Sequence, residues 1–129
     1  METATGINLF SPMRLRGVTA RNRLWISPMC QYSVFAEDGI PTDWHLVHYG
    51  SRAVGGAGLI LVEATAVEAR GRISAQDLGM WDDKQTEAYR PMVHFMAEHG
   101  AVPGVQLAHA GRKATVPGSI GPSALAFSE

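Results

Sequence analysis

The residues best suited to chemistry in this chain directly follow a short apolar run near its start. Residues 24–26, Leu-Trp-Ile, favour a β-strand, and the Ser27-Pro28 pair after them is typical of a strand that gives way to a loop. The thiol of Cys30 and the phenol of Tyr32 lie just beyond this point. Because irregular backbone can direct side chains at a ligand, we expect a functional site where this strand ends.

The composition restricts the kinds of partner that such a site would serve. The 129 residues are 46% hydrophobic and 18% charged, which is typical of soluble globular material of about one small domain. The formal net charge is -1 and the basic residues are scattered, so the sequence carries no electrostatic footprint for nucleic acid or for an anionic membrane. A small-molecule partner is therefore expected.

Cysteine content and hydropathy indicate the compartment. The single cysteine, Cys30, cannot form a disulfide within the chain, which fits a reducing environment. The first twenty residues lack the basic start and apolar core of a secretory signal, and no apolar run approaches roughly 18 residues. We expect a cytoplasmic protein.

Strands that alternate with helices are expected to position the site. In chain order we predict a hairpin over residues 13–19, a strand over 24–27, a helix from Thr42 or Asp43 to Ala53, a buried strand over 59–67, a helix from Asp82 or Asp83 to His99, and a strand over 102–108. Glycines 55, 56 and 58 would end the first helix and Gly100 the second, while Pro91 should kink or restart the second helix near Arg90. This alternation implies parallel pairing in a doubly wound sheet or in part of a (β/α)8 barrel, which periodicity alone does not separate.

Four segments carry a family resemblance. They are Asn22-Arg23, residues 27–32 (Ser-Pro-Met-Cys-Gln-Tyr), residues 71–73 (Gly-Arg-Ile) and residues 106–114 (Gln-Leu-Ala-His-Ala-Gly-Arg-Lys-Ala). In this order and spacing they resemble the old yellow enzyme family, most closely its thermophilic-like bacterial branch. The resemblance implies a (β/α)8 TIM barrel that binds FMN at the carboxyl ends of its strands. Residues 1–129 would then be the N-terminal part of a single FMN-binding barrel domain, supplying its hairpin and about its first three strands.

The resemblance also implies the roles of individual residues. Ser27, Pro28, Met29 and Cys30 resemble the first-strand segment that lines the flavin, Ala64 resembles a residue that contacts the flavin ring edge through its backbone, and Gln106 resembles the amide that hydrogen-bonds the pyrimidine side of the ring. Cys30 resembles the thiol that tunes the flavin potential, and Tyr32 the phenol that helps to hold the activating group of the substrate.

Each of these residues also has an ordinary structural interpretation. Without the surrounding motif, Cys30 would be a small buried hydrophobe, Tyr32 a loop aromatic and Gln106 a satisfied polar residue at a strand end. The chemistry of Gln106 nevertheless suits the flavin role, because an amide offers both a donor and an acceptor to the alternating N–H and C=O groups of a flavin pyrimidine, whereas a carboxylate offers acceptors only.

Other candidate sites are weaker. His45 and His48 lie three residues apart on a predicted helix, but two ligands are too few for a protein zinc site, and helix packing explains them better. The glycines at 55, 56 and 58 precede a strand, whereas a dinucleotide-binding loop must follow one, so we interpret them as a helix stop. His109 and Arg112 match the family pattern and could reach the flavin.

The reaction implied by the resemblance is that of an ene-reductase. NAD(P)H would reduce FMN, which would pass a hydride to the β-carbon of an activated alkene such as an α,β-unsaturated carbonyl compound. A complete (β/α)8 barrel takes about 250 residues, and the family's histidine pair, its proton-donating tyrosine and its phosphate-binding loops come from later strands. The chain would therefore act only with a complementary C-terminal part of the barrel, as a homo-oligomer when complete. The alternative is a non-catalytic fragment or interaction module with weak or no flavin binding.

Overall fold

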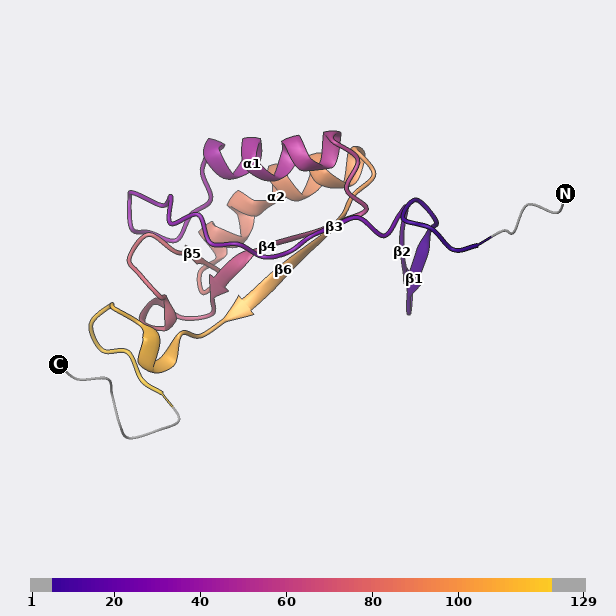
Figure 1. Ribbon diagram of the computed structural model, residues 1–129. Helices are drawn as coiled ribbons and strands as arrows, with labels where there is room; N and C mark the ends of the chain where they lie inside the picture. Colours follow the sequence, from indigo (N-terminus) through magenta and orange to yellow (C-terminus); the bar gives the residue numbers. More distant parts are fainter. Residues whose placement is uncertain (1–5, 122–129) are drawn as a thin grey trace, which may run out of the picture.

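A single parallel sheet organises the computed structural model, which describes residues 6–121 (Figure 1). Its central strand is β4 (Leu59–Ala66), and β6 (Val102–Ala108) pairs with β4 along one whole edge. The other edge of β4 is shared by two short parallel strands, β3 (Trp25–Ile26) at its beginning and β5 (Leu78–Gly79) at its end. All three pairings of β4 are parallel, as the alternation of strands and helices predicted.

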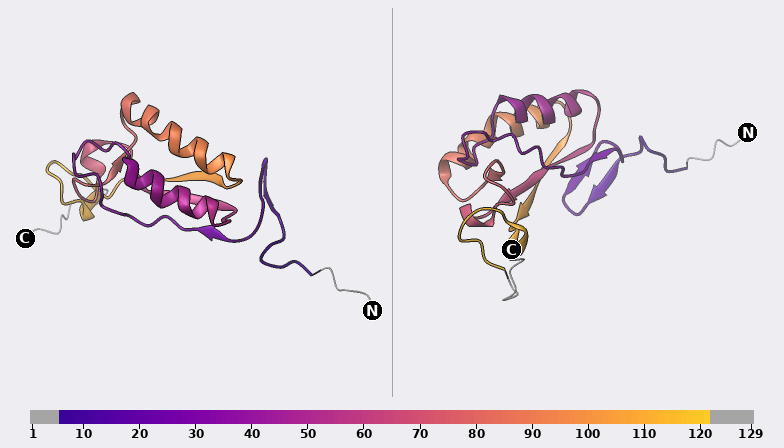
Figure 2. Two further views of the ribbon diagram at one scale, coloured as in Figure 1. Left: turned by 90° about the horizontal axis from the view of Figure 1, so that it is seen from above. Right: turned by 60° about the vertical axis from the view of Figure 1, so that its left-hand side comes forward.

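Two helices, α1 (Asp43–Val54) and α2 (Asp83–Glu98), lie side by side on one face of this sheet (Figures 1 and 2). The apolar core lies between the helices and β4. Its largest members are Tyr49, Ile60, Val62, Leu78, Tyr89, Met92 and Met96. Burial of these side chains holds both helices against β4.

The first part of the chain forms a small antiparallel hairpin of β1 (Met13–Leu15) and β2 (Val18–Ala20), as predicted. Figure 1 shows this hairpin beside the end of the sheet where β4 and β6 begin, opposite to their carboxyl ends. Two single-turn 3-10 helices, η1 (Ala69–Gly71) and η2 (Gly111–Lys113), follow β4 and β6 at those carboxyl ends. Among the described residues, no helix has the length and apolar character needed to cross a membrane.

The helix ends confirm the predicted capping residues. Thr42 is the N-cap of α1 and Gly55 ends it. Asp82 is the N-cap of α2, where its carboxylate accepts the Lys84 N–H at 2.8 Å, and the Gln85 side chain accepts the Asp82 N–H at 3.1 Å in return. This reciprocal arrangement is a capping box, which satisfies backbone donors that the first turn of a helix leaves free.

Three details differ from the sequence expectations. β3 is shorter than residues 24–27, because it pairs with β4 only at Trp25 and Ile26. The strand β5 lies in what the sequence predicted to be loop, and two residues carry too little pattern to be recognised as a strand. The helix α2 does not restart near Arg90 but includes Pro91, since burial of Tyr89, Met92 and Met96 holds it against the sheet on both sides of the proline.

Gly58 lets the chain before β3 approach the start of β4. A Cβ at this position would lie 2.7 Å from the backbone carbonyl oxygen of Asn22 and 3.0 Å from the backbone nitrogen of Asn22, and neither backbone atom can rotate away. We expect Gly58→Ala to lower the free energy of unfolding by about 1–3 kcal/mol. Urea titration measures this, with Gly17→Ala as the control, since a Cβ on Gly17 meets nothing within 4 Å. Equal effects of the two substitutions would contradict the close approach.

Burial of His45 on α1 gives folding a defined pH dependence. The His45 ring is fully buried, and its Nδ1 accepts the Thr42 N–H at 3.0 Å. Burial lowers the pKa of His45 from 6.5 to about 4, and the nearby His48 adds a smaller effect in the same direction. Because the unfolded chain takes up this proton more readily, stability is fully present above pH 6.5 and is lost as the pH falls toward about 4.

We expect His45 to contribute on the order of 3 kcal/mol to this loss by pH 4. His45→Gln cannot titrate but can still accept the Thr42 N–H, as in a capping box. In urea unfolding across this pH range, the free energy of unfolding should decline less steeply for the variant, because the titration of residue 45 is gone. The raised pKa of Glu63 acts in the opposite direction, but it does so in both proteins and leaves the comparison valid. Parallel declines would contradict the assignment to His45.

Candidate functional site

β4 and β6 run in parallel and end together at one edge of the sheet (Figure 1). β3 ends beside Ile60, near the start of β4, and the segment after it continues along β4 as far as Glu63 and Ala64. Ala64 of β4 and Gln106 of β6 are direct partners in the strand register. Each lies two residues before the last residue of its strand, whereas the sequence analysis expected positions at the strand ends. Ala64 is buried, while Gln106 is exposed.

The segment from Ser27 to Cys30 follows β3 and runs along β4 toward the same edge, where Cys30 reaches the backbone of Ala64. Met29 is 49% exposed and Cys30 is partly buried, so an apolar side chain and a thiol meet at the surface here. Burial raises the pKa of the Cys30 thiol, and the opposing effect of the neighbouring Ala64 N–H is smaller. Cys30 is therefore a neutral thiol close to the backbone of Ala64.

Tyr32 lies beside Cys30 in an uncommon backbone conformation. Its φ of +50° lies in the left-handed region, which non-glycine residues rarely adopt. Its side chain is 45% exposed, and its pKa is raised, chiefly by partial burial and next by Cys30. The phenol therefore stays protonated and can donate a hydrogen bond to a ligand.

These contacts bring together four of the residues that the sequence singled out, Cys30, Tyr32, Ala64 and Gln106, with Met29 beside them. Ser27 and Pro28 lie closer to β3 on the same segment, and Ser27 is exposed. The amide, the thiol, the phenol and the apolar Met29 surface can together receive a flat, largely apolar ring that also carries hydrogen-bonding groups.

The motif residue Arg72 connects the two loops that border this edge. One of its terminal nitrogens donates to the carbonyl oxygens of Glu37 and Ala75, both at 2.8 Å, and its guanidinium lies 5.3 Å from the centre of the Trp81 ring. Glu37 belongs to the loop after β3, whereas Ala75 and Trp81 belong to the chain between β4 and α2. Arg72 thus holds the two loops in a fixed relation to each other.

His109 contacts a different set of groups. Its Nε2 lies 2.7 Å from a carboxylate oxygen of Glu68, and this hydrogen bond is the main reason why the pKa of Glu68 is lowered. Its ring also packs closely against Gly71, where an added Cβ would lie 2.8 Å from the imidazole. His109 therefore ties the ends of β4 and β6 together, while Arg112 lies further on, in η2.

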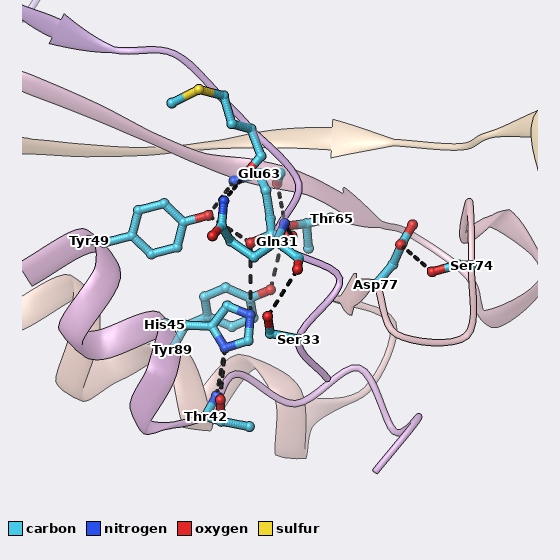
Figure 3. Close-up of polar contacts among 11 residues, drawn as sticks. Gln31, Ser33, Thr42, His45, Tyr49, Glu63, Thr65, Ser74, Asp77 and Tyr89 are labelled. Atoms are coloured by element: carbon cyan, nitrogen blue, oxygen red, sulfur yellow. Dashed lines mark hydrogen bonds and ion pairs between the residues drawn. The ribbon is translucent and has the colours of Figure 1, made fainter. Parts of the chain in front are cut away.

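The main residue that sequence reasoning missed is Glu63. It is 1% exposed, and its carboxylate accepts the Gln31 N–H at 2.7 Å and the Tyr49 hydroxyl at 2.9 Å (Figure 3). The signal in the sequence was a single carboxylate inside the apolar run of residues 59–67, because a buried acidic side chain is costly unless it is paired with hydrogen-bond donors.

The two histidines of α1 have structural roles. Thr42 and His45 form part of the helix cap, and His48 stacks on Trp44 and meets the edge of Tyr49. Within residues 6–121, no group of three or more His, Cys, Asp or Glu side chains is arranged to hold a metal ion.

Comparison with known proteins identifies the family of this chain. The chain is 57% identical, over 122 residues, to an NADPH dehydrogenase of Geobacillus sp. (strain WCH70), a match that covers 94% of this chain and 36% of the relative. The chain thus spans about a third of the length of the curated relatives that it matches.

Solved structures agree with the sequence match. The old yellow enzyme homologue from Zymomonas mobilis superposes with a TM-score of 0.76 at 35% identity, over 82% of this chain and 29% of that one. The old yellow enzyme from Pichia sp. AKU4542 gives a TM-score of 0.78 at 29% identity, over 84% and 28%. These neighbours are (β/α)8 barrels, and the described residues form a partial α/β unit of such a barrel, without closure.

The sequence model of the NADH:flavin oxidoreductase / NADH oxidase family matches residues 8–125, nearly the whole chain. The family is one of enzymes, and old yellow enzymes are among the structures that share this fold. The parallel order of the strands agrees with the barrel fold that the resemblance implied. The chain belongs to the NADH:flavin oxidoreductase / NADH oxidase family.

Proposed function

We propose that residues 1–129 supply the N-terminal part of a single FMN-binding (β/α)8 domain in a cytoplasmic, FMN-dependent ene-reductase. The observation that supports this most strongly is the pairing of Ala64 with Gln106 beside the Cys30 segment, at one edge of a parallel sheet. Bound FMN would supply hydride transfer from NAD(P)H to the β-carbon of an activated alkene. The residues of this chain would bind and orient the flavin and the substrate.

The chemistry of the exposed groups fits a flavin. Gln106 would pair its amide with the pyrimidine side of the ring, since it offers a donor and an acceptor together. Ala64 would contact the ring edge through its backbone. Ser27, Pro28, Met29 and Cys30 would line the flavin, and the exposure of Met29 leaves apolar surface for a ring to cover.

Cys30 and Tyr32 would act closest to the reaction. The neutral Cys30 thiol would contact the flavin and tune its potential, a means by which a protein adjusts cofactor electronics. The protonated Tyr32 phenol would donate a hydrogen bond to the carbonyl or nitro oxygen of the substrate. One such donor aimed at developing negative charge contributes roughly 10²–10³ in rate.

The remaining parts of the reaction need more of the barrel than this chain holds. The outer edge of β6 has no partner strand within residues 6–121, and Leu107 on that strand is 62% exposed. A complementary C-terminal part of the barrel would cover this edge and complete the substrate site. The completed enzyme would be a homo-oligomer.

The proposed function is tested by NADPH oxidation with the assembled barrel, this chain together with its complementary C-terminal part, and added FMN. We expect oxidation to accelerate when an α,β-unsaturated cyclic ketone is present and the saturated ketone to appear as product. The saturated ketone itself, offered as substrate, is the control. Flavin-dependent oxidation that no alkene accelerates would support a different acceptor and contradict ene-reduction.

Replacement of the thiol tests the role of Cys30. We expect Cys30→Ala to shift the reduction potential of the bound flavin, because a polarisable group beside the ring is removed while the backbone at Ala64 stays in place. Spectroscopic titration against a redox dye of known potential measures the shift. Lys84→Ala, an exposed change on α2, serves as the control. A potential equal to that of the wild type, with the fold intact, would remove Cys30 from the flavin site.

A further inference from the structure

Glu63 occupies an irregular position in the central strand. The register of β4 with β6 passes from the pair Val62 and Val105 directly to the pair Ala64 and Gln106, so Glu63 has no partner on β6. This β-bulge re-aims the side chain, as bulges do beside functional sites. Glu63 therefore points toward α1, where its own N–H donates to the Tyr49 hydroxyl oxygen at 2.9 Å.

The carboxylate of Glu63 joins three parts of the chain. One oxygen accepts the Tyr49 hydroxyl from α1 at 2.9 Å, and the other accepts the Gln31 N–H from the loop after β3 at 2.7 Å. Figure 3 shows Glu63 between Tyr49 and Gln31. A backbone amide paired with a buried carboxylate makes a strong, charge-assisted hydrogen bond.

The loop held by Glu63 carries the two side chains placed nearest to the reaction. Gln31 stands between Cys30 and Tyr32, and its carbonyl accepts the Ser33 hydroxyl at 3.0 Å while its side chain donates to the Met29 carbonyl at 2.9 Å. The left-handed backbone of Tyr32 is strained, and such a conformation persists only where the surroundings fix it. The Glu63 carboxylate ties this loop to the interior of the sheet through the Gln31 N–H and the neighbouring Tyr32 N–H. The Ala64 N–H at the Cys30 thiol is a further contact between the loop and β4.

Other charged and titratable groups near Glu63 do not replace this contact. His45 Nε2 lies 3.8 Å from the carboxylate, too far for a hydrogen bond, and burial keeps that ring neutral near pH 7. Asp77 accepts the Ile73 N–H at 2.6 Å and the Ser74 hydroxyl at 3.1 Å, and so holds a different loop.

The geometry points to Glu63 as a positioning residue of the flavin and substrate site, which fixes residues 29–33 through the Gln31 amide with Tyr49 as its support. The expected effect of Glu63 on the flavin rests on the proposed function. Its expected effect on the loop rests only on the contacts described above. Loss of the carboxylate would allow Cys30 and Tyr32 to move, although Glu63 itself would contact neither the flavin nor the substrate.

Hydrogen exchange measured by mass spectrometry on the assembled enzyme, this chain together with the rest of the barrel and FMN, tests this. In Glu63→Ala we expect exchange in residues 29–33 to rise about tenfold or more, because the buried partner of the Gln31 amide is gone. Glu63→Gln keeps one acceptor oxygen and should show a smaller rise. The matched control is Asp77→Ala, which removes another buried carboxylate and should speed exchange in residues 73–77 instead.

The flavin provides the second measurement. With the loop released, the visible absorption bands of the flavin should shift in Glu63→Ala, and kcat for an activated alkene should fall by roughly ten- to a hundredfold, while Asp77→Ala retains the wild-type spectrum. If Glu63→Ala does not fold, Glu63→Gln is compared with Asp77→Asn in the same way.

Unchanged exchange in residues 29–33 would overturn the inference. A uniform rise in hydrogen exchange that includes residues 43–54 and 102–108 would also overturn it, because such a rise indicates a general structural role. Faster exchange in residues 29–33 with an unaltered flavin spectrum would overturn it as well. A wild-type protein that binds no FMN would instead refute the proposed function. The exchange comparison needs no flavin and would still decide whether Glu63 holds the loop.

Discussion

The pairing of β4 with three other strands is the constraint on which the rest of the structure depends. β6 occupies one edge of β4, and β3 and β5 share the other, so every other strand of the sheet is placed by β4. The bulge at Glu63 lies in the middle of this strand. It changes the direction of one side chain, and that side chain reaches both α1 and the loop after β3. The position of the candidate site therefore follows from the backbone of a single strand.

Much of the fold could be predicted from residues that are close together in the sequence. The Asp82 cap, the glycines after α1 and the apolar run of β4 are each set by neighbouring residues in the chain, and their boundaries agree closely with the structure. The family was readable for a similar reason, since its motifs are contiguous segments. The choice between a doubly wound sheet and a barrel was not readable from periodicity, because both place helices between parallel strands. The resemblance and the solved relatives decide it.

The features that sequence reasoning missed depend on contacts between distant residues. Glu63 and Tyr49 meet only because a bulge rotates one of them toward the helix. β5 exists only because two residues reach the end of β4. Pro91 is tolerated because the buried side chains around it keep α2 on the sheet. In each case, tertiary packing outweighs the local preference, and no short pattern records that packing.

The most direct test of the central conclusion, that this chain contributes the first strands of an FMN-binding barrel, is native mass spectrometry combined with flavin absorbance on one purified sample. We expect flavin absorbance to accompany a species heavier than the 13.9 kDa of this chain, with FMN released on denaturation. A single colourless species of 13.9 kDa that takes up no FMN would contradict it, and Cys30, Ala64 and Gln106 would then be inherited features of the family without a cofactor to bind.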